Sequence, residues 1–87
     1  MATADPQPSP NPNALRFQLD IELPAAMNFN SAEEAAGHPF GEAVFAAEGV
    51  ASIFGVNDFV TVTRRPGAEW EPIVATVQAA AAEHLSS

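Results

Sequence analysis

The sequence predicts an α+β fold in which two helices cover one face of a four-stranded antiparallel sheet, in the order ββαββα. Three observations support this prediction. Residues 15–22 alternate between apolar and polar side chains, as in a half-buried strand. Residues 51–64 contain two β-rich runs separated by Asn57-Asp58, which suits a tight hairpin turn. Residues 69–85 carry apolar side chains at helical spacing.

The amino-terminal residues differ in composition from the rest of the chain. Four prolines alternate with other residues between positions 6 and 12, a pattern that excludes helix and favours extended polyproline-II backbone. We therefore expect residues 1–8 to form a flexible leader and residues 9–87 to form a single domain. For residues 9–13 an ordered lead-in to the first strand is also open, because asparagine side chains stabilise turns.

Two strands are expected after this segment. The alternation of residues 15–22 predicts the first strand, and Pro24 ends it. A second, shorter strand is expected over residues 26–30, with Met27 and Phe29 on the same side. Both strands would place their apolar side chains on one face of the sheet.

Helix signals then occur in three places. Ser31 and Glu34 fit a capping box, in which the side chain of each residue accepts a hydrogen bond from the backbone N–H of the other. Pro39 suits the first turn of a short helix, and Gly49 suits the position after its end. The last helix, over residues 69–85, has a continuous apolar stripe that must pack against the sheet.

The hairpin predicts an apolar contact surface. Because a two-residue turn preserves the alternation of side chains, Phe54 and Phe59 share the face opposite Val62. We expect the valine face to meet the helices, which leaves two phenylalanines on the other face with Arg16 and Arg64 nearby as cations. The alternative is that another segment of the chain covers both rings.

The composition excludes several classes of function. The absence of cysteine excludes disulfides, thiolate metal sites and a self-held iron–sulfur cluster. Three basic residues against 11 acidic ones give a net charge of −8, which disfavours nucleic acid and anionic membrane surfaces as partners. No apolar run approaches the roughly 20 residues that cross a bilayer, and no secretory signal is present, so we expect a cytoplasmic protein.

No group of residues has the pattern of a catalytic or cofactor site. His38 and His84 are the candidate metal ligands, with Glu33, Glu34 or Glu83 as helpers, but they lie far apart and outside any ligand-spaced motif. We therefore predict no catalytic residue, no metal ligand and no cofactor, and we expect a protein that is not an enzyme. Weak binding of iron or another divalent metal through carboxylates and His38 stays as an alternative.

Two separated blocks of sequence carry a recognisable pattern. The first, residues 9–17, reads Ser-Pro-Asn-Pro-Asn-Ala-Leu-Arg-Phe, and the second includes Asp-Phe-Val-Thr-Val-Thr-Arg at residues 58–64. Both resemble the N-terminal domain of Nfu/NifU-type iron–sulfur scaffold proteins, and the resemblance extends over residues 8–85. Ser9 stands where the family usually has Thr, and Phe40 stands where it often has Leu.

The resemblance implies an accessory domain of iron–sulfur cluster assembly or delivery. In the full-length scaffolds a CxxC motif in a separate domain holds the cluster, and this chain has no cysteine. We therefore expect a protein-interaction module whose partner is an iron–sulfur scaffold or a client apoprotein. An acidic interaction module without any link to clusters is the remaining alternative. The predicted partner-binding residues are Asn11, Pro12, Asn13, Arg16, Phe54, Asp58 and Phe59.

Overall fold

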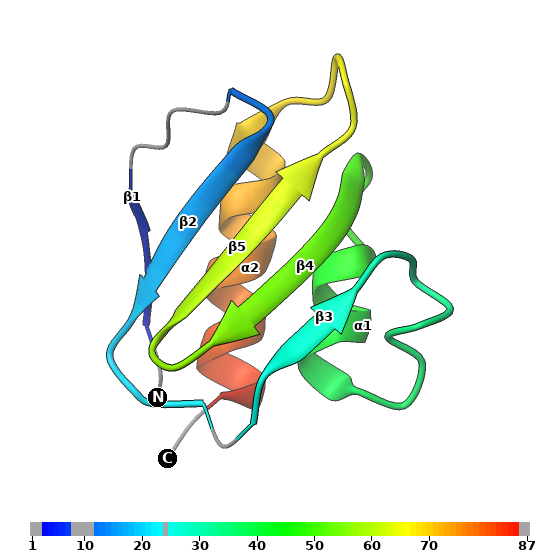
Figure 1. Ribbon diagram of the computed structural model, residues 1–87. Helices are drawn as coiled ribbons and strands as arrows, with labels where there is room; N and C mark the ends of the chain where they lie inside the picture. The colour runs from blue at the N-terminus through cyan, green and yellow to red at the C-terminus, as the bar shows by residue number, and fades with distance from the viewer. Residues whose placement is uncertain (1–2, 8–11, 24, 86–87) are drawn as a thin grey trace.

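A five-stranded antiparallel sheet with two helices on one face forms the protein (Figure 1). The computed structural model describes residues 3–7, 12–23 and 25–85. The strand order in the sheet is β1-β2-β5-β4-β3. The elements are β1 (Ala4–Gln7), β2 (Ala14–Leu19), β3 (Met27–Phe29), α1 (Pro39–Phe45), β4 (Val50–Val56), β5 (Phe59–Arg64) and α2 (Trp70–His84). None of the described helices has the length and apolar character needed to cross a bilayer.

The predicted fold class and the position of the helices are confirmed, but the predicted number of strands is one too few. The fifth strand, β1, lies within the residues predicted as a flexible leader and pairs antiparallel with the outer edge of β2. The Ala4 carbonyl also accepts a hydrogen bond from Gln78 Nε2 on α2 at 3.2 Å. Pro6 is compatible with this position, because an edge strand has one side without ladder hydrogen bonds.

The core lies between the sheet and the helices. Along β5, Val60 and Val62 are fully buried, while Phe59 and Thr61 face away from the helices, as the parity of the hairpin predicts. Each fully buried large side chain stabilises the fold by about 1.5–3 kcal/mol. The largest of these are Phe17, Phe40, Val44, Ile53, Val60, Val62, Ile73 and Val77.

The predicted two-residue hairpin turn is confirmed. Val56 pairs with Phe59, and Asn57 between them has a φ of 56°, a left-handed conformation that asparagine tolerates. The turn is also tied to the chain that follows β2. The carbonyl oxygen of Asn57 accepts from the Leu23 N–H at 2.6 Å, so the connection between β2 and β3 is fastened to the tip of the hairpin.

Two side chains that pack closely over its Cα explain the glycine in β4. Gly55 pairs with Met27 on one side and with Val60 on the other, so the ladder is regular at this residue. A Cβ atom at Gly55 would lie 2.9 Å from Met27 Cγ and 3.0 Å from Leu23 Cδ1. The absence of a side chain therefore allows Met27 and Leu23 to close over the end of the core.

The turn before α1 is held by side-chain hydrogen bonds. Ser31 Oγ accepts from the Glu34 N–H at 3.2 Å, as in the predicted capping box. The Glu34 carboxylate reaches one residue further than predicted, to the Asn30 N–H at 2.9 Å. At the start of α1, His38 Nδ1 accepts from the Gly41 N–H at 3.1 Å, so histidine is the N-cap.

Candidate functional site

The face of the sheet that points away from the helices is nearly free of charge. Figure 1 views the sheet from this side, with both helices behind it. Among its outward-facing side chains only Asp5 and Arg16 are charged, and their charges are opposite, although the whole chain carries −8. We call this set the outer face; its residues are Asp5, Gln7, Ala14, Arg16, Gln18, Asn28, Ser52, Phe54, Val56, Phe59, Thr61 and Thr63.

Two phenylalanines form the apolar centre of the outer face, as the sequence predicts. The Phe54 side chain is 44% exposed, the largest exposure of any bulky apolar residue in the described chain. Phe59 is half-buried, and the guanidinium carbon of Arg16 lies 4.0 Å from the centroid of its ring. Because Phe54 pairs with Thr61 and Phe59 pairs with Val56, the two phenylalanines are diagonal neighbours.

The second predicted cation of this surface lies elsewhere. Arg64 packs on the helix side, with its guanidinium carbon 5.2 Å from the ring of Trp70. Its Nη1 donates to the Ala68 carbonyl at 2.8 Å. The prediction that Arg64 lies near the outer face is therefore wrong, because Arg64 shares the side of β5 that carries Val62. Arg16 alone supplies positive charge to the outer face within the described residues.

The Pro-Asn segment before β2 is anchored by hydrogen bonds at the end of the sheet opposite the β4–β5 hairpin turn. Trp70 Nε1 donates to the Pro12 carbonyl at 3.2 Å, and the Arg64 N–H donates to the Asn13 carbonyl at 2.8 Å. Arg64 Nε also lies 3.4 Å from Asn13 Oδ1. This part of the motif therefore joins β2 to the start of α2. Asn11 lies outside the described residues, and a recognition role for the segment stays a prediction.

Asp58 lies at the tip of the hairpin, at one end of the outer face. The residue is exposed, and its carbonyl oxygen accepts from the Leu19 N–H at 2.8 Å and from Gln18 Nε2 at 2.9 Å. These bonds fix the backbone of Asp58. Its predicted role in binding a partner stays a prediction.

The two histidines have local structural partners. His38 Nδ1 is occupied as the cap of α1, and its ring lies 5.0 Å from the ring of Phe29. His84 Nε2 lies 3.6 Å from a carboxylate oxygen of Glu83. Within the described residues no group of three or more histidines, cysteines or acidic residues is placed to hold a metal ion.

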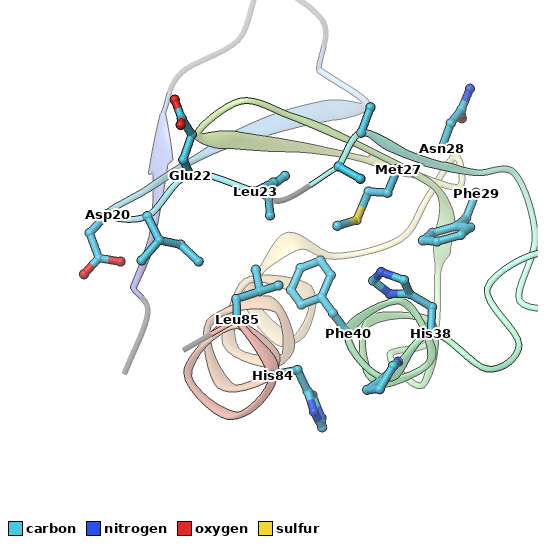
Figure 2. Close-up of a pocket in the computed structure, with 14 residues that line it drawn as sticks. Asp20, Glu22, Leu23, Met27, Asn28, Phe29, His38, Phe40, His84 and Leu85 are labelled. Atoms are coloured by element: carbon cyan, nitrogen blue, oxygen red, sulfur yellow. The ribbon is translucent and has the colours of Figure 1, made fainter. Parts of the chain in front are cut away.

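A concave feature, which the sequence analysis missed, lies on the helix side. A groove of about 930 Å³ is bounded by the β2–β3 connection, by β3, by the start of α1 and by the end of α2 (Figure 2). We call it the β3 groove. Its lining residues are Asp20, Ile21, Glu22, Leu23, Ala25, Ala26, Met27, Asn28, Phe29, His38, Pro39, Phe40, His84 and Leu85.

The fold and sequence match a known protein family. The family model described as "Scaffold protein Nfu/NifU N terminal" matches residues 5–87. The chain belongs to this family. The resemblance seen in the two sequence blocks is thereby confirmed, and membership of a scaffold-protein family favours a role other than catalysis for this Nfu N-terminal domain.

Relatives that carry this domain are longer proteins. The chain is 34% identical over 84 residues to the mitochondrial NFU1 iron-sulfur cluster scaffold homolog of Drosophila ananassae, covering 93% of this chain and 29% of that protein. It is 36% identical over 83 residues to a NifU-like protein of Schizosaccharomyces pombe, covering 91% of this chain and 32% of that protein. The chain thus spans about a third of the length of these relatives.

Solved structures share the fold. The NMR structure of a NifU-like protein from Saccharomyces cerevisiae matches with a TM-score of 0.78 at 19% identity, covering 94% of this chain and 76% of that one. The crystal structure of protein SAV1430 from Staphylococcus aureus matches with a TM-score of 0.75 at 24% identity, covering 92% and 98%. At this level of identity the likeness concerns the fold of the Nfu N-terminal domain alone.

Proposed function

We propose that this chain is a non-enzymatic protein-contact module of iron–sulfur cluster assembly or delivery, and that it binds its partner through the outer face. The observation that carries the proposal is the exposed Phe54 ring at the centre of a nearly uncharged surface on a strongly acidic chain. Protein interfaces typically have a centre depleted in charged residues and enriched in aromatic residues and arginine. Phe54, Phe59 and Arg16 provide this composition.

We propose that the partner supplies the cluster ligands. Iron–sulfur clusters are held by cysteine thiolates, and the chain contains none. The Drosophila relative is named as an iron-sulfur cluster scaffold homolog, and about two thirds of the length of both relatives lies outside the region that this chain matches. We therefore propose that the partner is an iron–sulfur scaffold or a client apoprotein, and that the domain positions it without holding the cluster.

The experiment that tests the proposal compares three forms of the chain as bait. Wild type, Phe54→Ser and Ala79→Ser are immobilised and used to capture proteins from the native cell, which are then identified by mass spectrometry. Ala79 is an exposed residue on α2, on the other side of the molecule, so its variant is the matched surface control. We expect iron–sulfur proteins to bind wild type and the control, and to be lost with Phe54→Ser.

Two results would contradict the proposal. Equal capture by wild type and Phe54→Ser would exclude the outer face as the binding surface. A reproducible partner set that contains no iron–sulfur protein would leave an acidic interaction module without a link to clusters. Stoichiometric iron binding by the purified chain would instead support the metal-binding alternative.

The cytoplasmic location expected from the sequence is part of the proposal. The name of the Drosophila relative places that protein in mitochondria. The same contact function is compatible with either compartment, so the location of this chain has to be measured. Fractionation of native cells, with an antibody against this chain, is expected to recover it with cytoplasmic markers. Recovery with an organelle fraction would overturn this part of the proposal.

A further inference from the structure

We infer that the β3 groove binds an extended peptide segment of a partner protein, which has bulky apolar side chains flanked by lysine or arginine. The groove lies on the helix side of the sheet (Figure 2) and shares one residue, Asn28, with the outer face. Three features of the groove support the inference: its apolar floor, its two carboxylates without a cationic partner among the described residues, and the edge position of β3.

The floor of the groove is apolar and is assembled from four segments. Leu23, Met27, Phe40 and Leu85 point toward one another in Figure 2, and each is at most 8% exposed. The lining includes two alanines, Ala25 and Ala26, and both are exposed. Because their side chains are small, the entrance of the groove stays open beside them. A volume of about 930 Å³ is near the upper end of the range of about 300–1,000 Å³ for binding pockets. The groove therefore has room for more than one bulky side chain.

The acidic side chains of the groove favour a positively charged ligand. Asp20 and Glu22 are exposed in its lining, which contains no lysine or arginine. Asp20 Oδ1 accepts from the Thr3 N–H at 2.8 Å, and within the described residues neither carboxylate has a cationic partner. The two lining histidines lie at the start of α1 and the end of α2, where His38 already caps its helix. Opposite charge on a ligand would be attracted here, while an acidic ligand would be repelled.

The edge of the sheet offers backbone groups to an extended segment. β3 is the last strand in the sheet order, and in the described chain it pairs only with β4. An edge strand presents unpaired N–H and C=O groups, to which a peptide can add as a further strand. Alternate side chains of such a peptide would point to the same side as Met27 and Phe29, toward the groove. Because β3 has three residues, the side chains must carry much of the affinity.

The test uses a synthetic peptide, Lys-Lys-Leu-Thr-Leu-Thr-Leu-Lys-Lys, with blocked ends. Titration into the isotope-labelled full chain is followed by NMR, and affinity is measured by fluorescence anisotropy of a dye-labelled peptide. We expect saturable shifts confined to residues 20–29, 38–40 and 84–85. We expect the double variant Asp20→Asn/Glu22→Gln to weaken binding by about two- to thirtyfold, which corresponds to two exposed ion pairs.

The control is Glu48→Gln/Glu71→Gln, which removes the same charge from exposed positions outside the groove. It is expected to change affinity less than twofold at ordinary salt, because screening weakens distant charges. Replacing the threonines of the peptide by proline removes backbone donors and is expected to weaken binding; equal affinity would overturn strand addition at β3.

Four results would overturn the inference. They are equal binding of a peptide with glutamate in place of lysine, shifts centred on Phe54 instead of the groove, no saturable binding of the lysine peptide, and formation of a dimer through the groove that excludes the peptide. Octylamine is the small-molecule comparison. If it saturates the groove while the peptide does not, the site takes small amines and the peptide inference is wrong.

Discussion

The guanidinium of Arg16 on β2 lies over the ring of Phe59 on β5, with its central carbon 4.0 Å from the ring centroid. The two residues are diagonal neighbours across the strand pair, because Arg16 pairs with Thr61 and Phe59 pairs with Gln18. Arg16 therefore covers part of one phenylalanine of the outer face while Phe54 remains uncovered.

A double-mutant cycle measures the Arg16–Phe59 contact. Arg16→Gln, Phe59→Leu and the combined variant are compared with wild type by urea denaturation. The expected coupling free energy is about 0.5–1 kcal/mol, the usual range for a cation–π contact at an exposed site. A coupling indistinguishable from zero would mean that the contact contributes nothing to stability, and Arg16 would then be available to a partner at no cost.

Phe54 and Val62 should respond differently to truncation. Val62→Ala is expected to cost about 2 kcal/mol or more and to lower Tm by roughly 10 °C, because it leaves a cavity in the core. Phe54→Ser is expected to change stability by less than about 0.5 kcal/mol, since Phe54 is an exposed residue. Thermal melting of both variants, followed by circular dichroism, tests this. If Phe54→Ser melts as low as Val62→Ala, Phe54 is part of the core and the proposed contact surface does not exist.

Local patterns in the sequence were sufficient to predict most of the fold. The hairpin parity is an example: a two-residue turn and a period of two fix which side of the sheet Phe54, Phe59 and Val62 occupy. The same alternation places Arg64 beside Val62, on the helix side. The prediction for Arg64 did not follow this alternation, and the ring of Trp70 that packs against its guanidinium belongs to a helix that the local pattern does not connect to β5.

The fifth strand and the groove depend on contacts between distant residues. Of the residues of β1 only Ala4 is buried, so the segment has no apolar pattern and is held by pairing with β2 and by Gln78. The groove combines residues from four segments, and no local motif connects Leu23 with Leu85. His38 is a weak sequence signal because histidine is not among the preferred N-cap residues.

Substitution of His38 tests its role as the cap of α1. His38→Ala removes the acceptor for the Gly41 N–H and the ring beside Phe29, so it is expected to destabilise the chain by about 1 kcal/mol. His38→Asn keeps a capping acceptor and is expected to recover part of this loss. Urea denaturation of the two variants gives the comparison. Equal losses for both would assign the effect to the ring contact with Phe29 instead of to capping.

Asn13 links the segment before β2 to Arg64. Asn13→Ala removes the side-chain acceptor near Arg64 Nε and is expected to cost on the order of 1 kcal/mol in urea denaturation. Asn28→Ala, at an exposed position of β3, is the control and is expected to change stability by a few tenths of a kcal/mol. If Asn13→Ala keeps full stability and loses the captured partner, the segment acts in recognition. If both stability and capture are unchanged, neither role is correct.

The purified chain should not assemble an iron–sulfur cluster. Cluster irons are bound mainly by cysteine thiolates, the chain has no cysteine, and its described residues contain no group of three candidate ligands. Anaerobic incubation with iron and sulfide, followed by desalting, is therefore expected to leave no charge-transfer absorption in the visible spectrum. A cysteine-containing cluster scaffold treated in parallel is the positive control for the reconstitution. A coloured species that is stoichiometric and resists a chelator would show that other side chains hold a cluster, and the domain would then be a carrier in its own right instead of a contact module.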